Sequence, residues 1–300
     1  MTMDVHGILP ALVTPFDEAG EVRTGALEAL LERLYTHRAD GVYVCGQTGE
    51  GLLMAPAARE KVAEIAVLNS PAPAQVVVHV GAACVADAMR LARHAEHVGA
   101  GAISSLPPIG SFSFDEIHAY YRELASATGL PVLVYYFPEV APAIRTLDQI
   151  LSLCEIPGVV GLKFTDFDLY RLGEIRRAGH VVMNGRDEVL AAGLYMGANG
   201  GIGTFYNLIP RTFAEIQSAA LAGDWKQARR LQDGVNRLIR LSLAYPVFPA
   251  VKWMLEWSGI DAGHCLKPRL ALTAEQKEQL EHDLREDGFT PEGFAQGIVA

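Results

Sequence analysis

Two residues suited to carbonyl chemistry stand at the ends of two short apolar runs. Lys163 ends the run over residues 156–163, and Tyr135 ends the run over residues 130–135. An amine condenses with a ketone to form a Schiff base, and a phenol beside it can move protons. A solvated lysine at a strand exit and a tyrosine ring in the core would give the same pattern. The rest of the chain must therefore decide between chemistry and structure.

Short apolar runs like these recur along the first two-thirds of the chain. Most are continuous rather than alternating, which is typical of parallel strands buried on both faces. Helical patterns separate them, including a helix that Asp168 is expected to cap. Eight strands alternating with helices predict an α/β fold, a (β/α)8 TIM barrel; a doubly wound sheet stays open on pattern alone. The expected strands cover residues 8–13, 41–45, 76–80, 102–105, 132–135, 159–163, 181–183 and 201–204.

The strand pattern stops near residue 222. Helices are expected over residues 225–243 and 248–257, and a third starts at Thr273, where Thr-Ala-Glu-Gln fits a capping box. No linker rich in Pro, Gly or Ser separates the two parts. We therefore expect a barrel over residues 1–222 and a C-terminal helical extension, residues 223–300, packed on it.

The polar candidates fall where a barrel gathers its chemistry, at the C-terminal ends of its strands. Scattered structural residues would not all fall there, so this convergence favours a site. By strand, the candidates are Gln47 and Thr48 after the second, Tyr135 at the end of the fifth, Lys163 and Thr165 at the sixth, Asp187 and Glu188 after the seventh, and Gly203 and Thr204 at the eighth.

Each candidate also has a purely structural explanation. Residues 46–50 could be a tight turn that needs glycine, or their amides and threonine hydroxyl could cradle a carboxylate. Asp187 and Glu188 open a helix, where acids complement the dipole without any ligand. Tyr43 is expected in the core, and His79 as a buried, hydrogen-bonded imidazole. Glycines crowd the eighth strand, so a backbone or ligand is expected to approach it closely.

Composition narrows the partners. The chain has 300 residues, half of them hydrophobic, and a formal net charge of −10 without a basic stripe, which argues against nucleic acid. No apolar stretch reaches about 18 residues and the start lacks a signal pattern, which argues against a membrane. No His/Asp/Glu cluster has metal-ligand spacing. The cysteines are widely spaced and fit core positions in a reducing cytoplasm: Cys45, Cys84, Cys154 and Cys265.

With these residues placed, nearly the whole chain resembles the pyruvate-dependent class I aldolases, the family of dihydrodipicolinate synthase and N-acetylneuraminate lyase. The anchors are GILPALVTPF at 7–16, GQTGEG at 46–51, Tyr135 and Lys163. The chain is most similar to the N-acetylneuraminate lyase branch in three segments: GLKFTDFDL at 161–169, NGRDE at 184–188 and GGIGTFYN at 200–207. The second segment adds Gly185 to the candidate site residues. The arginine that dihydrodipicolinate synthases carry after Tyr-x-x-Pro is missing.

The resemblance implies a cytoplasmic Schiff-base lyase that releases pyruvate from a polyhydroxylated 2-keto acid without a cofactor. Lys163 would form the imine, Tyr135 would move the proton, and Thr48 with Gln47 would hold the carboxylate. Thr165, Gly185, Asp187, Glu188, Gly203 and Thr204 would bind the aldehyde half. A homotetramer is implied as well. Other 2-keto-3-deoxy sugar-acid aldolases or dehydratases, a dihydrodipicolinate synthase-like condensation and a non-enzymatic keto-acid-binding regulator remain alternatives.

Four departures from the family pattern bear on the substrate. Gln47 replaces a serine or threonine, Tyr136 replaces a smaller polar residue, and residues 106–110 lack a tyrosine that many members lend to a neighbouring subunit. Glu139-Val140-Ala141-Pro142 replaces the small residues that line the cleft of the sialate lyases. Facing the cleft, Glu139 would repel an anionic aldehyde half; facing solvent, it would not affect specificity.

Overall fold

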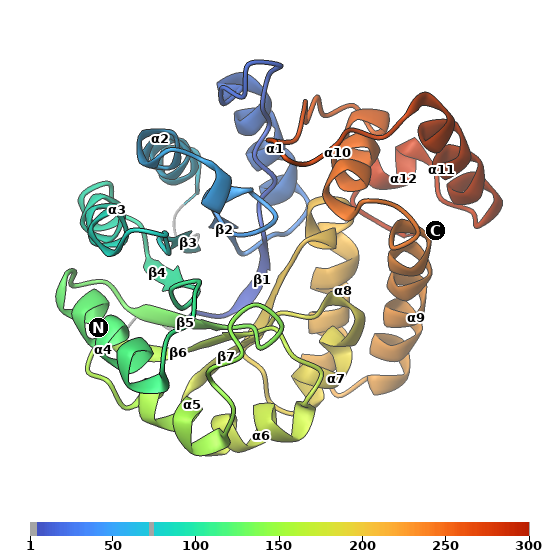
Figure 1. Ribbon diagram of the computed structural model, residues 1–300. Coiled ribbons are helices and arrows are strands. Elements are labelled where there is room, and N and C mark those ends of the chain that lie inside the picture. Colours follow the sequence, from blue (N-terminus) through green and yellow to red (C-terminus); the bar gives the residue numbers. More distant parts are fainter. Residues whose placement is uncertain (1–4, 72–74, 300) are drawn as a thin grey trace.

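Eight parallel strands alternate with helices around a central barrel in the computed structural model, which describes residues 5–71 and 75–299 (Figure 1). Neighbours in the sheet are neighbours in the sequence, and β8 pairs with β1. The strands are β1 (Gly7–Pro10), β2 (Gly41–Val44), β3 (Gln75–His79), β4 (Ala102–Ser105), β5 (Val132–Tyr136), β6 (Val159–Phe164), β7 (Val181–Asn184) and β8 (Gly200–Gly203). The predicted (β/α)8 TIM barrel is confirmed.

The helices follow the expected alternation. The barrel helices are α1 (Thr24–Thr36), α2 (Pro56–Leu68), α3 (Val85–His97), α4 (Phe114–Ser126), α5 (Leu147–Cys154), α6 (Leu169–Arg177), α7 (Leu190–Tyr195) and α8 (Pro210–Leu221). Three short 3-10 turns are η1 (Gly51–Leu53), η2 (Asp187–Val189) and η3 (Phe205–Asn207). The C-terminal helices are α9 (Trp225–Ser242), α10 (Val247–Trp257), α11 (Ala274–Glu286) and α12 (Pro291–Ala295).

The barrel closes between β1 and β2 through a few backbone contacts. The Leu12 amide donates to the Tyr43 carbonyl at 2.8 Å, and the Asp40 amide donates to the Ile8 carbonyl at 3.0 Å. β1 ends at Pro10 rather than at residue 13, because the chain then bends over the rim, where the Val13 amide donates to the Asn207 side chain at 3.1 Å. Residues 11–13, which were predicted as strand, therefore belong to the loop at the rim of the barrel.

The strands are buried on both faces, as their continuous apolar runs predict. One buried cluster fills the barrel and includes Leu9, Val77 and Tyr135; a larger one lies between the strands and the helices and includes Val134 and Tyr136. Successive side chains of a strand point to opposite faces, so Tyr135 faces the barrel interior and Tyr136 faces the helices.

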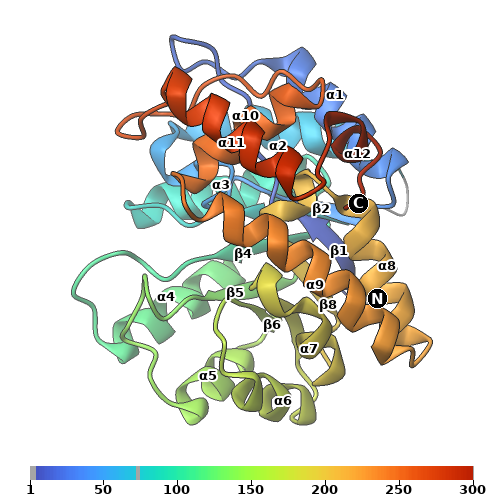
Figure 2. The ribbon, with the colours of Figure 1, turned by 90° about the vertical axis from the view of Figure 1, so that its right-hand side faces the viewer.

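The C-terminal helices lie together on one flank of the barrel, and α9 packs beside α8 (Figure 2). The capping box at Thr273 is confirmed, with its hydroxyl accepting from the Gln276 amide at 3.2 Å. In the described part of the chain no single helix is long and apolar enough to cross a membrane; α9 and α10 pass that test only together, bent by 113°. The domain boundary at residue 222 stays a prediction.

One expectation about the cysteines was wrong. Cys45 and Cys154 are buried and Cys265 is half-buried, but Cys84 is exposed. Cys84 stands just before α3 in a surface turn, where the chain leaves the barrel rim. Small size and wide spacing in the sequence do not reveal such a position.

A buried ion pair ties the barrel to the extension. Glu50, in the loop after β2, lies 2.8 Å from the amine of Lys252 on α10, and their side chains are 0% and 3% exposed. Glu50 also accepts from the Leu266 amide at 2.8 Å and lies 3.4 Å from the Arg269 guanidinium. One hydrogen bond and two ion pairs thus hold the loop against α10 and the segment that follows it.

Removing one partner of this pair should destabilise the protein strongly. Breaking a buried pair costs about 3–5 kcal/mol, because an uncompensated charge stays buried. Since Arg269 remains beside Glu50, we expect Lys252→Met to lower the free energy of unfolding by about 2–3 kcal/mol in urea titrations, and Glu50→Gln/Lys252→Met to recover part of the loss. Arg229→Met, which removes an exposed pair with Asp233, is the control and should cost under about 1 kcal/mol. Equal losses of unfolding free energy in Lys252→Met and Arg229→Met would contradict the expectation.

Candidate active site

The residues predicted for the site surround one cavity of about 260 Å³ at the C-terminal ends of the strands. Contributions come from β5, β6 and β8, from the loops after β2 and β7, and from the helical extension. Every predicted site residue lines it: Gln47, Thr48, Tyr135, Lys163, Thr165, Gly185, Asp187, Glu188, Gly203 and Thr204. The structure therefore brings together residues that lie up to 157 positions apart in the sequence.

Lys163 reaches into the barrel interior from the end of β6. Its side chain is 4% exposed, and its amine lies 4.3 Å from the ring centre of Tyr43 and 4.1 Å from that of Tyr135. Burial lowers the pKa of this amine to about 7, although the nearby Asp187 carboxyl opposes the shift. An amine with this pKa is neutral in about half of the molecules at pH 7 and can act as a nucleophile.

The walls around this amine are buried and aromatic. The rings of Tyr43, Tyr135 and His79 lie about 6 Å from one another, centre to centre. His79 is satisfied as expected: its Nε2 accepts from the Leu106 amide at 3.1 Å, so Nδ1 carries the proton and donates to the Cys45 carbonyl at 3.1 Å. Burial holds the pKa of His79 well below its usual value, so the imidazole is neutral.

Tyr43 is in the core, as expected, but it also forms part of the site. Its hydroxyl donates to Ser104 at 3.1 Å, away from the cavity, while its ring faces the lysine amine. A tyrosine in the second strand gives no sequence signal for this contact, because the contact depends on the closure of the barrel.

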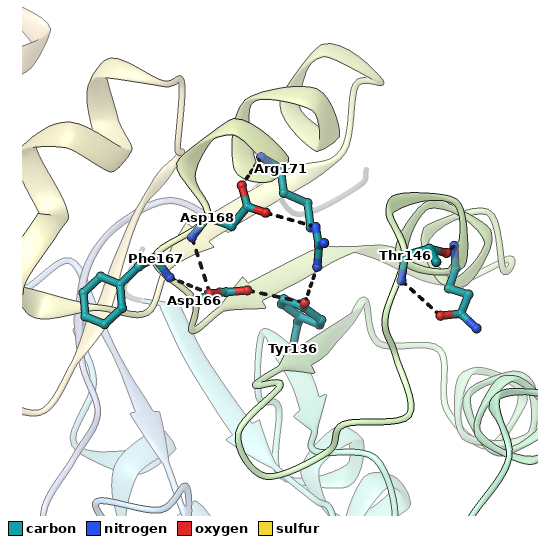
Figure 3. Close-up of polar contacts among 7 residues, drawn as sticks. Tyr136, Thr146, Asp166, Phe167, Asp168 and Arg171 are labelled. Atoms are coloured by element: carbon teal, nitrogen blue, oxygen red, sulfur yellow. Dashed lines mark hydrogen bonds and ion pairs between the residues drawn. The ribbon is translucent and has the colours of Figure 1, made fainter.

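The two consecutive tyrosines of β5 face different surroundings. Tyr135 belongs to the barrel interior, where burial raises the pKa of its phenol well above the usual value. Tyr136 faces the helices, where its hydroxyl accepts from the Arg171 guanidinium at 2.7 Å and lies 3.4 Å from the Asp166 carboxylate (Figure 3). Of the two phenols, therefore, only Tyr135 lines the cavity.

The loop after β2 presents a hydroxyl beside β8. Thr48 lies 2.7 Å from Thr204, hydroxyl to hydroxyl, and Thr48 is 4% exposed. Across the cavity, Thr165 lies near enough to lower the pKa of the Tyr135 phenol, yet its hydroxyl makes no hydrogen bond of normal geometry within the described residues. The Thr165 hydroxyl therefore stands beside the Tyr135 phenol on the cavity wall.

Asp187 is more than an acid at a helix start. Its carboxyl accepts from the Phe205 amide at 2.8 Å and is 7% exposed, and burial raises its pKa to about 7. A side-chain carbon at Gly203 would lie 2.0 Å from its carboxyl oxygen, which explains why β8 needs glycine there. The close backbone approach expected at β8 is confirmed at Gly200, where a side-chain carbon would lie 2.0 Å from the Gly7 carbonyl oxygen; at Gly203 the neighbour is a side chain of the site.

The helical extension holds this part of the site in place. The Gln232 amide of α9 donates to the Asp187 carbonyl at 2.9 Å, and the Asn236 amide donates to the Glu188 carbonyl at 3.0 Å. Sequence reasoning missed the wall that the extension adds to the cavity, because a rule about strand ends does not reach helices: this wall is Leu243, Val247 and Phe248. It also missed Phe137 and Arg186, although Arg186 stands between two predicted residues.

Across residues 5–71 and 75–299, no group of three or more His, Cys, Asp or Glu side chains is arranged to hold a metal ion. The described cavity instead offers an amine, a phenol, hydroxyls and two carboxyl groups. These groups suit covalent carbonyl chemistry with proton transfer.

Fold and cavity together define a (β/α)8 barrel with a buried lysine in a cavity at the C-terminal ends of its strands. A model of the dihydrodipicolinate synthetase family matches residues 4–287. The chain belongs to this family. Its members named N-acetylneuraminate lyase are similar along their length: that of Citrobacter koseri is 37% identical over 89% of this chain and 92% of its own, and that of Rhizobium meliloti is 37% identical over 89% and 90%.

Solved structures agree with these relatives. A Clostridium difficile protein crystallised in complex with mannosamine has a TM-score of 0.90 and 27% identity, covering 95% of this chain and 99% of its own. The N-acetylneuraminate lyase of Mycoplasma synoviae has a TM-score of 0.86 and 29% identity, covering 94% and 97%. The chain is therefore an enzyme, a carbon–carbon lyase of the class I aldolase type.

The pKa of Lys163 predicts how imine formation depends on pH. Only the neutral amine attacks a ketone, so the rate at which pyruvate and borohydride modify Lys163 should fall about tenfold per unit below pH 7 and level off above it. An ordinary lysine, with a pKa of 10.5, would keep gaining rate up to pH 10. Because the Asp187 carboxyl raises the pKa of Lys163, Asp187→Asn should move the acidic limb to lower pH. Peptide mass spectrometry over a pH series measures both, and a move to higher pH would contradict the electrostatic explanation.

Proposed function

We propose that this enzyme cleaves a polyhydroxylated 2-keto acid through a Schiff base on Lys163 and releases pyruvate, with N-acetylneuraminate as the leading candidate substrate. This proposal rests on the amine of Lys163, which Tyr43 and Tyr135 enclose at the floor of the cavity and whose lowered pKa favours its neutral form. The names of the relatives support the substrate class.

The first step joins enzyme and substrate. The neutral Lys163 amine attacks the C2 carbonyl carbon, and the resulting carbinolamine takes up a proton and loses water, which leaves a protonated imine. Thr48, with its hydroxyl beside Thr204, and Gln47 bind the carboxylate of the keto acid. The buried aromatic walls keep bulk water from the imine.

The second step breaks the C3–C4 bond. The Tyr135 phenol, which burial keeps protonated, relays the proton of the C4 hydroxyl: it accepts that proton while its own passes to the substrate carboxylate beside it. The bonding electrons move into the imine, and an aldehyde leaves. The enamine that remains is protonated at C3, and hydrolysis of the imine frees pyruvate and restores Lys163. The protonated imine accepts the electrons, so these steps need no added electron sink.

The aldehyde half lies toward the β7 loop in this proposal. Thr165, Asp187 and Glu188 bind its hydroxyls, and Gly185 and Gly203 give them room. Other 2-keto-3-deoxy sugar acids are the second candidate, because the wall after β5 departs from the sialate lyases. A cytoplasmic homotetramer, as the family resemblance implies, is part of the proposal.

Trapping with borohydride tests the covalent step. Pyruvate and borohydride should add one reduced pyruvyl group to Lys163, and Lys163→Ala should lose both this adduct and turnover. Lys252 provides an internal control, since it is equally buried but paired with Glu50. An adduct on Lys252, or none on Lys163, would refute the assignment.

The two tyrosines provide a matched pair of variants. We expect Tyr135→Phe to lower kcat by about 10²–10⁴, as for loss of a general acid–base group, while Lys163 still forms the adduct. Tyr136→Phe removes a hydroxyl that faces Arg171 on the other side of the strand and should change kcat far less. Steady-state kinetics on N-acetylneuraminate and on shorter 2-keto-3-deoxy sugar acids compare them. A larger loss in Tyr136→Phe would mean that the wrong phenol has been chosen.

A further inference from the structure

Arg186 joins three loops at the mouth of the cavity. It follows β7, and its guanidinium carbon lies 5.4 Å from the ring centre of Phe137 after β5 and 4.6 Å from that of Phe167 after β6. The guanidinium also forms an ion pair with Glu139. The Arg186 side chain is 17% exposed and lines the cavity, so two aromatic rings and a carboxylate hold a cation beside the substrate.

A second polar network fixes the loop that carries Phe167 (Figure 3). The Asp166 carboxylate accepts from the Phe167 amide at 2.7 Å and faces the Tyr136 hydroxyl. Asp168, the expected cap of α6, accepts from the Arg171 amide at 3.0 Å and pairs with its guanidinium at 3.4 Å. Tyr136, which departs from the family pattern, thus serves the scaffold under Phe167.

Glu139 does neither of the two things expected of it. It does not line the described cavity, so it does not repel a ligand there, and although its side chain is 64% exposed it pairs with Arg186 instead of facing only solvent. Its effect on specificity therefore passes through Arg186, whose position it fixes and whose charge it partly balances.

Arg186 retains donors for a ligand. Its guanidinium lines the cavity, and the hydrogen bond to Glu139 uses Nη2; the Nε is enclosed by protein and makes no hydrogen bond to any described residue. A guanidinium can only donate, whereas the neighbouring carboxyl groups of Asp187 and Glu188 on the cavity wall chiefly accept. A hydroxyl does both and suits such a wall. A second carboxylate on the substrate would face Arg186, which is already paired with Glu139, and the acidic side chains of Asp187 and Glu188.

We propose that Arg186 is a specificity-determining residue that donates to the hydroxyl oxygens of the distal aldehyde half, while Asp187 and Glu188 accept from the same hydroxyls. The substrate class is then a 2-keto acid whose aldehyde half is neutral and polyhydroxylated. Glu139 and Phe167 are positioning residues for Arg186. This inference rests on the proposed function and identifies Arg186 as a residue that recognises the substrate.

Arg186→Met tests the proposal, because it keeps the length of the side chain and removes its donors. Two probes share the C4 hydroxyl: N-acetylneuraminate, or the best-cleaved shorter sugar acid, and 4-hydroxy-2-oxopentanoate, which has no hydroxyl beyond C4. The ratio of kcat/KM between the polyhydroxylated and the short compound should fall about 10–100-fold, as for loss of a charge-assisted hydrogen bond. Arg229→Met, at an exposed site, is the control and should leave the ratio unchanged.

Glu139→Gln tests the same idea without touching the cavity wall. With the charge of Arg186 no longer balanced, a keto acid with a distal carboxylate should gain kcat/KM relative to the neutral substrate, about three- to tenfold. An unchanged ratio in both variants would overturn the role of Arg186. A wild-type preference for the distal carboxylate that Arg186→Met abolishes would overturn the neutral class. Absence of the pyruvate adduct from the wild-type enzyme would refute the proposed function itself, so the two failures are distinguishable.

Discussion

The site depends on the burial of one amine. A lysine exposed to water keeps its proton near neutral pH, so the proposed imine chemistry requires an environment that disfavours charge. The barrel provides it: closure between β1 and β2 places Tyr43 over the Lys163 amine, and β5 places Tyr135 against it. The neutral His79 adds a third ring without adding a charge. Asp187 is close enough to limit the shift, which keeps the amine near the balance between its two forms.

The helical extension completes the site rather than decorating it. α9 holds the backbone after β7 through the Gln232 and Asn236 amides, and α10 adds Val247 and Phe248 to the cavity wall. Lys252 of α10 also pairs with Glu50. Glu50 stands two residues after Thr48, in the loop that faces the substrate carboxylate in the proposed mechanism. The barrel alone would therefore lack both a wall and a fixed loop.

Much of this could be predicted from the sequence, because continuous apolar runs and the residues at their ends depend on local order alone. The eight strands and the groups at their C-terminal ends follow from that pattern. What could not be predicted depends on pairing across the rim: the partnership of Arg186 with Glu139, 47 residues away, has no periodicity to reveal it. The wall from α10 was missed for the same reason. The short helix α12 was missed although Thr290 and Pro291 are ordinary start signals, because five residues carry too little amphipathic pattern.

The pair between Glu50 and Lys252 also orders events during synthesis. Glu50 leaves the ribosome about two hundred residues before Lys252, so the loop after β2 carries an uncompensated carboxylate through most of translation. Until α10 has emerged, that loop lacks the cation with which Glu50 is paired in the folded protein. A chain that ends before α10 contains the sequence of all eight strands but lacks Lys252 and the Val247 and Phe248 side chains of the cavity wall. The wall of the cavity around the buried amine is therefore complete only once residues 247–252 have been synthesised.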